Sequence, residues 1–328
     1  MEKIDFVITW VDGSDPVWLA ERAKYVSDSD TKRKDVAGSA RYHDNGLLQY
    51  LFRGIEKFTP WVNKVHFVTY GHLPAWLNTG CEKLRVVNHR DFLPENALPT
   101  FSSVPLNLNL HRIPGIADRF VYFNDDMFLV SPCGPEVFFK DGLPCDMAVM
   151  DVIPATENTA YWHMVYNDTI MLNANYNKKE SIKAHKRKWY SHEYRKNTVK
   201  NLLLAPFAFF PGIYETHLPA SYLKSAYEKA WEDNFDTLSA VTQHKVRSND
   251  DVSENFIRYC QLASGDFAPL NKLKTGRFCN MASKALPGFI TSGRYKYLCI
   301  NNEVEGEPFE RTKAAFESIL PEKSGFEI

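Results

Sequence analysis

Residues 4–16 read IDFVITWVDGSDP and combine a strand-like half with a turn-like half. Residues 4–11 are apolar and rich in β-branched side chains, which predicts a buried β-strand. Residues 12–16 (DGSDP) end this strand, because Gly, Asp and Pro are typical of turns. These five residues could form a plain turn, but the buried strand before them predicts that Asp12 lies at the end of a sheet and faces a cleft.

Three further segments show this pattern, in which an apolar, strand-like run is followed by a turn-forming residue. Helix-like segments lie between them, with apolar residues at helical spacing over 45–58 and again around 104–112. This alternation predicts a Rossmann-like α/β fold, in which a mostly parallel sheet carries helices on both faces. The three segments are VHFVTY (65–70), LRVV (84–87) and FVYF (120–123).

The chain changes character beyond residue 155, where it becomes helical and loop-like with few strand-like runs. Residues 147–152 are a weaker strand candidate just before this change. Residues 221–232 and 252–263 have the apolar spacing of helices. Because there is no internal repeat and no low-complexity linker, the simplest interpretation is one domain with a helical elaboration in its second half.

Polar residues gather where the predicted strands end. Ligands of such sheets bind beyond the carboxyl ends of the strands, so these residues predict a binding site. Two adjacent carboxylates in the stretch 124–126 could hold Mg²⁺ or Mn²⁺, which prefer oxygen ligands and bridge phosphates. Both carboxylates bind only if the chain turns there, since adjacent strand residues face opposite ways; an ordinary turn is the alternative. The polar residues are Asp12 and Asp15, His89 and Asp91, and Asn124, Asp125 and Asp126.

Two stretches of the second half offer the groups that a phosphoryl transfer to a hydroxyl needs. Residues 217–219 (HLP) contain a histidine, which titrates near neutral pH and can accept the hydroxyl proton. Residues 244–251 (HKVRSNDD) contain an arginine, whose planar fork can bind phosphate oxygens and offset their charge. Taken alone, a single histidine is more often structural than catalytic.

A basic segment stands directly before an apolar one. Residues 183–200 contain seven Lys/Arg against one Glu, and residues 202–213 (LLLAPFAFFPGI) are almost wholly apolar. The ordinary interpretation is a solvated face followed by a buried segment. The alternative is a surface over 183–212 that makes a peripheral contact with an anionic membrane.

Composition narrows the class of protein and its compartment. The 39 Lys and Arg nearly balance the 40 Asp and Glu, so no overall charge attracts the chain to nucleic acid. The six cysteines form no C-x-x-C pair, which indicates neither a zinc site nor a disulfide framework. The N-terminus enters a strand at once, leaving no room for a signal peptide, and no apolar run is long enough to span a membrane. We therefore expect a cytoplasmic protein, with the inner face of the plasma membrane as its alternative location.

Four ordered blocks of the chain resemble the Stealth family. IDFVITWVDGSDP (4–16) resembles the family's first signature, whose usual form is IDVVYTWVNGSDP. Residues 41–133, with RYHDN, LHRIPG and FVYFNDDMF in the family's order, resemble its second region. Residues 217–256, from HLP to HKVRSNDDVSENF, resemble the third, and YLCINNE (297–303) with the tail to Glu327 resembles the fourth.

The resemblance implies a reaction. Stealth proteins include bacterial capsule phosphotransferases and the animal lysosomal-enzyme N-acetylglucosamine-phosphotransferase. A sugar-1-phosphate would pass from a nucleotide-diphosphate sugar to a hydroxyl of an acceptor saccharide, and a phosphodiester would form. We expect the donor to be a UDP-hexose or UDP-N-acetylhexosamine, so that UMP is released. The implied setting is the synthesis of capsular or cell-surface polysaccharide on a lipid-linked acceptor.

The resemblance also implies site residues. The family's histidine in an H-x-P context falls on His217, and its arginine in an HKVR context falls on Arg247. We expect these two residues to be catalytic together with Asp125 and Asp126, which would also bind Mg²⁺ or Mn²⁺. The expected substrate-binding residues are Asp12, Gly13, Asn45, Arg53, Arg112, Asn124, Asn249 and Asp250.

Some positions depart from the family pattern. Asp12 replaces the usual Asn, and the family's DNDEL appears as DNGLL (44–48), without its Glu. Val104 and Asn107 stand where Asn and Glu are usual, and Asn302 replaces an Asp. We interpret these changes as tuning for a different substrate, or as the mark of a subfamily with smaller acceptors.

The whole chain, 1–328, is thus expected to be one catalytic domain. Residues 1–155 would form the nucleotide-sugar-binding core, 156–216 a helical insertion with the basic and apolar segments, and 217–328 the part that completes the site. A metal-dependent GT-A-like glycosyltransferase that releases UDP is the alternative enzyme. A non-catalytic sugar-binding module, using the abundant aromatic residues, is the alternative outside enzymes.

Overall fold

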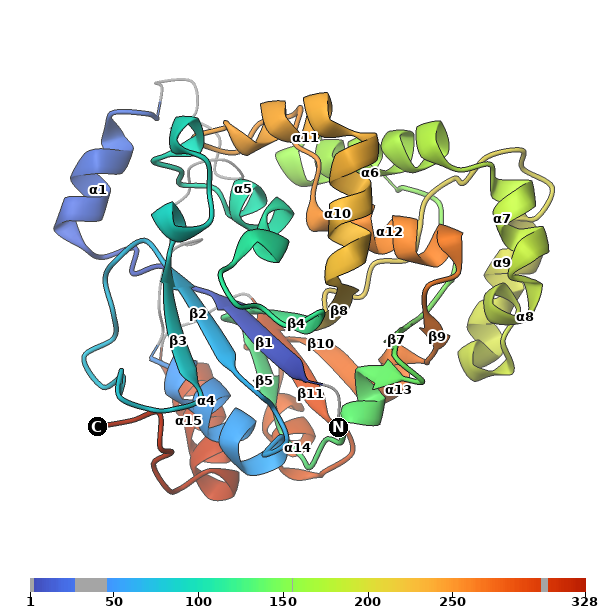
Figure 1. Ribbon diagram of the computed structural model, residues 1–328. Helices are drawn as coiled ribbons and strands as arrows, with labels where there is room; N and C mark the ends of the chain where they lie inside the picture. Colours follow the sequence, from blue (N-terminus) through green and yellow to red (C-terminus); the bar gives the residue numbers. More distant parts are fainter. Residues whose placement is uncertain (1–2, 27–45, 155, 302–305) are drawn as a thin grey trace.

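The computed structural model describes residues 3–26, 46–154, 156–301 and 306–328, and Figure 1 shows its elements. The strands are β1 (Ile4–Thr9), β2 (Val65–Thr69), β3 (Leu84–Asn88), β4 (Arg119–Asn124), β5 (Met127–Leu129), β6 (Phe139–Lys140), β7 (Leu143–Asp146), β8 (Ala220–Leu223), β9 (Ala268–Pro269), β10 (Gly276–Asn280) and β11 (Tyr297–Asn301). The α-helices are α1 (Pro16–Ala23), α4 (Leu48–Phe58), α5 (Ser103–Leu108), α6 (Ala160–Asn175), α7 (Lys178–Ala184), α8 (Lys186–Trp189), α9 (Thr198–Leu204), α10 (Lys224–Asp233), α11 (Phe235–Thr242), α12 (Glu254–Ser264), α13 (Lys272–Thr275), α14 (Leu286–Thr291) and α15 (Glu307–Ile319). Short 3₁₀ helices include η4 (Leu110–Arg112) and η6 (His192–Asn197).

A five-stranded sheet lies at the centre, in the order β3-β2-β1-β4-β8. The first four strands run parallel, and they are the four segments with the strongest strand pattern in the sequence. β8 runs antiparallel to β4, with Leu223 opposite Arg119. The predicted α/β fold with a mostly parallel sheet is therefore confirmed.

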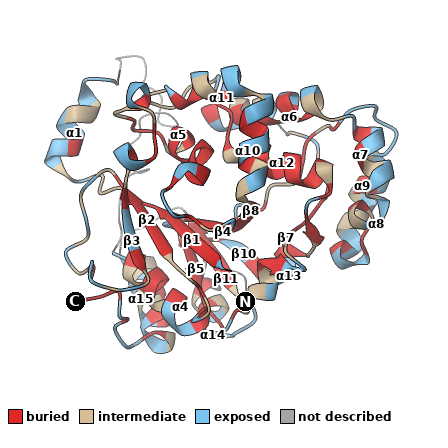
Figure 2. Ribbon diagram, in the orientation of Figure 1, coloured by how far each residue is buried: buried red, intermediate tan, exposed pale blue. Residues whose placement is uncertain are grey.

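Helices cover both faces of this sheet, as predicted. Phe6 and Ile8 of β1 pack into a core with α4, α14 and α15, whereas Val7 packs on the other face with α5, α10, α11 and α12. Successive strand residues point to opposite faces, so a strand buried on both faces is apolar throughout. Figure 2 shows the buried sheet between the partly exposed helices.

A second sheet, β10-β11-β5, continues directly from the first. β4 leads through a two-residue turn at Asp125 and Asp126 into β5, which pairs antiparallel with β11. The backbone N–H of Ile300 in β11 donates to the carbonyl oxygen of Asp126 at 2.9 Å. This turn is therefore fixed between two sheets rather than lying in a free loop.

Two segment predictions were wrong. Residues 147–152 form no strand: β7 ends at Asp146, and the only pairing in the stretch is one isolated bridge between Met150 and Ile213. The helix predicted over 221–232 begins only at Lys224, because the residues before it pair with the edge of β4 as β8. β10 and β11 were also missed in a half of the chain that was expected to hold few strands.

Residues 156–216 hold α6, α7, α8 and α9, which extend to one end of the molecule (Figure 1). Trp189, Tyr194 and Phe210 form a core of their own there with Tyr259 and Leu262 of α12. None of the described helices is long and apolar enough to cross a membrane. All six cysteines lie in the described part of the chain and are free thiols.

Candidate active site

The turn between β4 and β5 lies at the carboxyl end of the parallel strands. The Tyr122 hydroxyl donates to Asn124 Oδ1 at 2.5 Å and lies 3.1 Å from Thr9 Oγ1 at the end of β1. These contacts orient the Asn124 amide at the boundary between the two strands. Ligands of parallel sheets bind at this edge, so the turn is the natural centre of a site.

Asp126 receives groups from two distant parts of the chain. Its Oδ2 accepts a hydrogen bond from the Cys299 thiol at 3.3 Å and lies 3.6 Å from His217 Nε2. Its Oδ1 is buried and accepts no hydrogen bond from any described residue. Asp125, the neighbouring residue, is exposed. Asp126, His217 and Cys299 thus form a cluster whose nearest ligand atoms all lie within 4.8 Å of one another.

His217 is positioned by the strand that follows it. β8 begins three residues later and pairs with β4, which brings the imidazole to the turn at Asp126. Its backbone has a φ of 46°, a left-handed conformation that is uncommon outside glycine. Burial alone would lower the pKa of His217, but its interaction with Asp126 and the charges of Glu254 and Glu215 together outweigh burial and raise the pKa above its ordinary value. The imidazole is therefore coupled to the carboxylate on which the predicted metal site depends.

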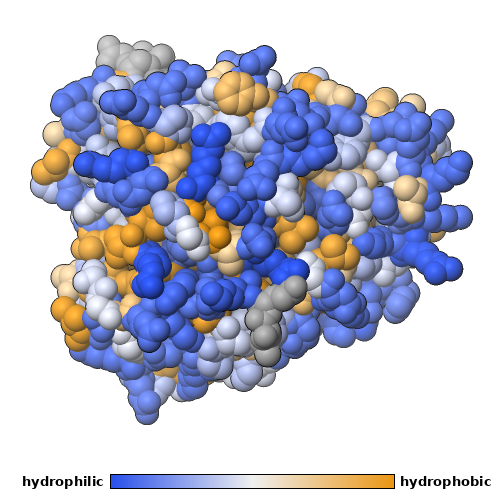
Figure 3. All heavy atoms as spheres, in the orientation of Figure 1, coloured by the Kyte–Doolittle hydropathy of each residue, from blue (hydrophilic) through white to orange (hydrophobic). Residues whose placement is uncertain are grey.

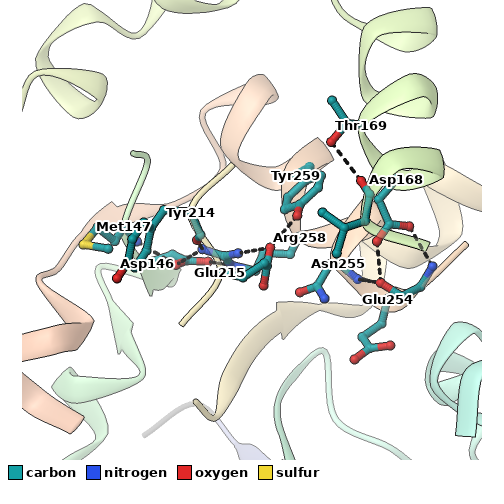
Figure 4. A network of polar contacts seen from close by, with 12 residues as sticks. Asp146, Met147, Asp168, Thr169, Tyr214, Glu215, Glu254, Asn255, Arg258 and Tyr259 are labelled. Carbon is teal, nitrogen blue, oxygen red and sulfur yellow. Dashed lines mark hydrogen bonds and ion pairs between the residues drawn. The ribbon is translucent and has the colours of Figure 1, made fainter. Parts of the chain in front are cut away.

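A buried polar network anchors the segment before His217 (Figure 4). Arg258, only 2% exposed, donates from Nε to Asp146 Oδ2 at 2.6 Å and from Nη1 to Glu215 Oε1 at 3.0 Å. The Tyr259 hydroxyl also donates to Glu215. Burial alone would raise the pKa of Asp146, but the Arg258 guanidinium and the ammonium of the buried Lys272 together outweigh burial and lower the pKa to about 2. The network ties the chain two residues before His217 to α12 and to β7.

The start of α12 carries a glutamate that the sequence analysis did not single out. Ser253 caps α12 and donates from its backbone N–H and hydroxyl to the buried Asp168, at 2.7 and 2.6 Å. Glu254 follows, and Figure 4 shows its carboxylate directed away from Asp168. Burial raises the pKa of Glu254, opposed by the Asn107 amide and by the Arg247 guanidinium. The same carboxylate contributes to the raised pKa of His217, so Glu254 lies within electrostatic reach of both expected catalytic residues.

The loop that carries Arg247 is held by the buried Asp251. His244 Nδ1 lies 2.7 Å from Asp251 Oδ1, and the backbone N–H of Ser248 donates to Oδ2 at 2.9 Å. From α6, the Asn167 amide donates to the carbonyl oxygens of Asn249 and Asp251, at 2.8 and 2.9 Å. Arg247 is therefore presented on a fixed loop, with Asp250 exposed beside it.

His244→Gln is expected to destabilise the protein more at about pH 5 than at about pH 9. The hydrogen bond with Asp251 raises the pKa of His244 above 6.5, with burial opposing and Asp250 adding to the rise. A group whose pKa rises on folding stabilises fully below its unfolded pKa, and this stability is lost as the pH rises through the folded pKa. Urea unfolding at the two pH values checks this expectation, and an equal loss of unfolding free energy at both would contradict it.

The segment after β1 forms both a turn and a helix cap. Asp12 Oδ1 accepts from the Ser14 backbone N–H at 2.8 Å and from its hydroxyl at 2.6 Å, and the latter bond lowers the pKa of Asp12. The backbone N–H of Asp12 donates to His72 Nε2 at 2.7 Å, and Asp15 caps α1. Gly13 lies within this turn. The plain-turn interpretation therefore describes its local geometry, at the carboxyl end of β1.

Both arginines that were expected to bind substrate contact protein groups instead. Arg53 makes a two-pronged ion pair with Glu327, at 2.9 and 2.8 Å, and donates to the Leu320 carbonyl oxygen at 3.1 Å. Arg112 lies over the Trp231 ring, 4.2 Å from its centroid. The structure does not bring either guanidinium to the cluster at Asp126. Asn45, together with the departure from the family pattern at Asn302, lies outside the described residues.

His89, at the end of β3, is buried and packs edge-on against Tyr70. Burial lowers the pKa of His89 to about 3, so this imidazole is neutral at physiological pH. Asp91 accepts a hydrogen bond from the Asn88 backbone N–H at 2.7 Å and closes the turn after β3. These two residues stabilise the sheet edge beside the site.

Comparison with known proteins places the chain in a class and a family. Conserved region 1 of the Stealth proteins matches residues 2–30, and conserved region 2 matches residues 41–145. The capsular polysaccharide phosphotransferase WcwK of Streptococcus pneumoniae and the receptor polysaccharide phosphotransferase WefC of Streptococcus oralis are each 37% identical over 337 residues, covering 100% of both chains. These full-length matches define the class: the chain is a phosphotransferase. It belongs to the Stealth family, as its sequence blocks indicated.

A solved structure of the galactosyltransferase LgtC with donor and acceptor sugar analogs also matches. It shares 12% identity at a TM-score of 0.43 and covers 96% of each chain. A match at this level carries no information about activity.

Proposed function

We propose that the protein transfers a sugar-1-phosphate from a UDP-hexose or UDP-N-acetylhexosamine to a hydroxyl of an acceptor saccharide. The product is a phosphodiester in a capsular or other cell-surface polysaccharide, and UMP is released. The names of the full-length relatives support the polysaccharide as the end product. The observation that carries the mechanism is the imidazole of His217, 3.6 Å from a carboxylate oxygen at the carboxyl edge of the sheet.

The donor diphosphate would lie against the turn at Asn124–Asp126, with Asp12 near the nucleotide. The donor set fits Mg²⁺ or Mn²⁺: Asp126 Oδ1 is a buried carboxylate oxygen without a described partner, and Asp125 is exposed next to it. Burial and Asp126 raise the pKa of Cys299, so it remains a thiol and donates to Oδ2 rather than offering a thiolate. When bound, a divalent cation would offset the charge of the diphosphate.

The chain's own residues would carry the remaining chemistry. His217 accepts the proton of the acceptor hydroxyl, and Asp126 stabilises the resulting imidazolium. The acceptor oxygen forms a bond to the β-phosphorus of the donor while the bond from that phosphorus to the bridging oxygen breaks. The nucleoside monophosphate leaves as an anion, so no strong general acid is required. Arg247 offsets the negative charge on the transferring group.

Asp126→Asn is expected to raise the Mg²⁺ concentration needed for half-maximal UMP release, because the variant replaces a charged oxygen ligand with a neutral amide. EDTA is expected to abolish UMP release by the unchanged protein. Asp141→Asn, at a turn between β6 and β7, is the matched control and should leave the Mg²⁺ dependence unchanged. An Asp126→Asn protein with unaltered Mg²⁺ dependence would remove this residue from the metal site.

The reaction is tested by incubating the protein with a panel of UDP-sugars, Mg²⁺ and an oligosaccharide acceptor. The released nucleotide is then separated and identified. Release of UMP supports phosphotransfer, whereas release of UDP would establish a glycosyltransferase. Sugar binding by calorimetry, without release of any nucleotide and independent of metal, would establish a binding module.

The setting of the reaction is part of the proposal. We infer a lipid-linked acceptor and a cytoplasmic reaction at the inner face of the plasma membrane. The six free thiols support a reducing compartment. Activity recovered with inverted membrane vesicles that carry the lipid-linked acceptor would test this location.

A further inference from the structure

Large apolar side chains of α9 and the loop after it are exposed to solvent, Val199 among them. We call four of them the apolar ridge: Leu202, Leu203, Phe207 and Phe209 are 59%, 71%, 45% and 54% exposed. The two phenylalanine rings contact each other, with their centroids 5.9 Å apart. A groove of about 320 Å³ adjoins the ridge, where Phe209 meets Tyr166 and Ile170 of α6. Monomeric soluble proteins rarely expose contiguous apolar surface unless it contacts a partner.

Hydrogen bonds from Lys178 and Asn173 fix the backbone of the loop that carries the ridge. Lys178 is 2% exposed, and its ammonium donates to the carbonyl oxygens of Leu204 and Phe207 at 2.6 and 2.8 Å. The Asn173 side chain accepts from the Phe210 backbone N–H at 2.8 Å and donates to the Phe210 carbonyl oxygen at 2.9 Å. A buried ammonium is costly unless carbonyl oxygens solvate it, so these contacts specify one loop conformation. The ridge is therefore exposed because the loop is fixed in this conformation.

Basic side chains lie on the helices beside the ridge. α7 and η6, both packed beside α9, and the neighbouring α8 expose six lysines and arginines against two glutamates. Lys188 and Lys200 do not belong to this set, because Lys188 donates to the Gly265 carbonyl oxygen and Lys200 pairs with Asp151. Figure 3 shows hydrophilic side chains crowded at this end of the molecule. The six are Lys179, Lys183, Lys186, Arg187, Arg195 and Lys196, and the glutamates are Glu180 and Glu193.

We propose that the apolar ridge and these six basic residues form a docking surface for an anionic lipid bilayer. Leucine and phenylalanine side chains enter the interfacial region, while lysine and arginine bind the headgroups. A second copy of this chain fits less well, because a twofold contact would bring two sets of like charges together. Nucleic acid also fits less well, because its phosphates would bind the basic residues but would leave the apolar ridge exposed to water.

One helix, α6, contacts both the loop that carries Arg247 and the groove beside the ridge. On α6, Asn167 binds the loop of Arg247, whereas Tyr166 and Ile170 line the groove beside the ridge. Docking would therefore set the orientation of the site relative to the bilayer. The proposal does not depend on the proposed reaction, since binding is measured without donor or acceptor.

Vesicle sedimentation tests the proposal with the full chain. We expect binding to vesicles of phosphatidylcholine and phosphatidylglycerol, no binding to phosphatidylcholine alone, and weaker binding as salt rises. Lys186→Glu combined with Arg187→Glu should reduce binding about tenfold or more, and Leu203→Glu combined with Phe207→Glu should do the same. The matched controls are Lys284→Glu with Arg294→Glu, on either side of α14, and Val17→Glu on α1, all at exposed positions. These controls should bind as the unchanged protein does.

Three results would overturn the proposal. One is no sedimentation with either vesicle. Another is binding that neither lipid charge nor the Lys186/Arg187 variant alters. The third is a dimer in sedimentation velocity that the Leu203/Phe207 variant dissociates, without vesicle binding, which would assign the ridge to a second copy. If the apolar variant fails to fold, the Lys186/Arg187 variant decides, because both of its side chains are exposed.

Discussion

His217→Asn is expected to lower the turnover number for UMP release by about 10²-fold or more, since a positioned general base contributes at least this factor. Asparagine is chosen because it tolerates the left-handed backbone of this position, where φ is 46°. The loss should therefore reflect the missing base rather than backbone strain. Steady-state kinetics with saturating donor and acceptor would measure it.

The control for this variant is His192→Asn, which changes a side chain that is 93% exposed on η6. It should retain the turnover of the unchanged protein. Both variants should keep the melting temperature, because neither imidazole is part of a buried core. A His217→Asn protein with near-normal turnover would end the assignment of this residue as the base.

Arg258→Met is expected to lower the free energy of unfolding by about 3–5 kcal/mol, because it leaves two carboxylates, one buried and one partly buried, without the guanidinium that pairs with both. The carboxylates are those of Asp146, which is 3% exposed, and of Glu215, two residues before His217. Urea unfolding followed by circular dichroism would measure the loss. Turnover should fall as well, since the segment that positions His217 loses its anchor.

Lys229→Met is the matched control, because Lys229 forms an exposed ion pair with Asp233 one helical turn away. It should leave the unfolding free energy almost unchanged. Adding Asp146→Asn to the Arg258→Met variant should restore part of its stability by removing one uncompensated charge. A loss below about 1 kcal/mol in Arg258→Met, the range of an exposed pair, would show that the network is not a buried anchor.

The parallel core of the fold could be predicted because its strands are buried on both faces and read as continuous apolar runs. β8 could not, since Ala220–Leu223 merges without a break into the helical spacing of α10. A four-residue strand contains too few residues to show a period of two. A strand was predicted over 147–152 instead of at β7, which ends at Asp146. Residues 147–150 are apolar because they are fully buried in the core, although they form no strand.

The residues of the candidate site also divide into those that the sequence could predict and those that it could not. The stretch 124–126 was predicted because it follows a strand. The chemistry of residues 217–219 and 244–251 pointed to a histidine and an arginine, but only the family resemblance predicted catalytic roles for His217 and Arg247. Cys299 and Glu254 were missed as site residues, because no local pattern distinguishes a core thiol or a helix N-terminal glutamate from one that faces a site. Arg53 illustrates the converse, since its partner Glu327 lies 274 residues away in the chain. Partners of this kind are set by tertiary packing alone.

The late position of β8 and β11 in the chain has a consequence for biosynthesis. On the ribosome, the first four strands can pair once residue 124 has emerged, but the free edge of β4 stays open until residues 220–223 follow. An open edge of this kind invites pairing with other nascent chains. Protein fragments that end before β8 should therefore collect in aggregates rather than compete with the finished enzyme for its donor.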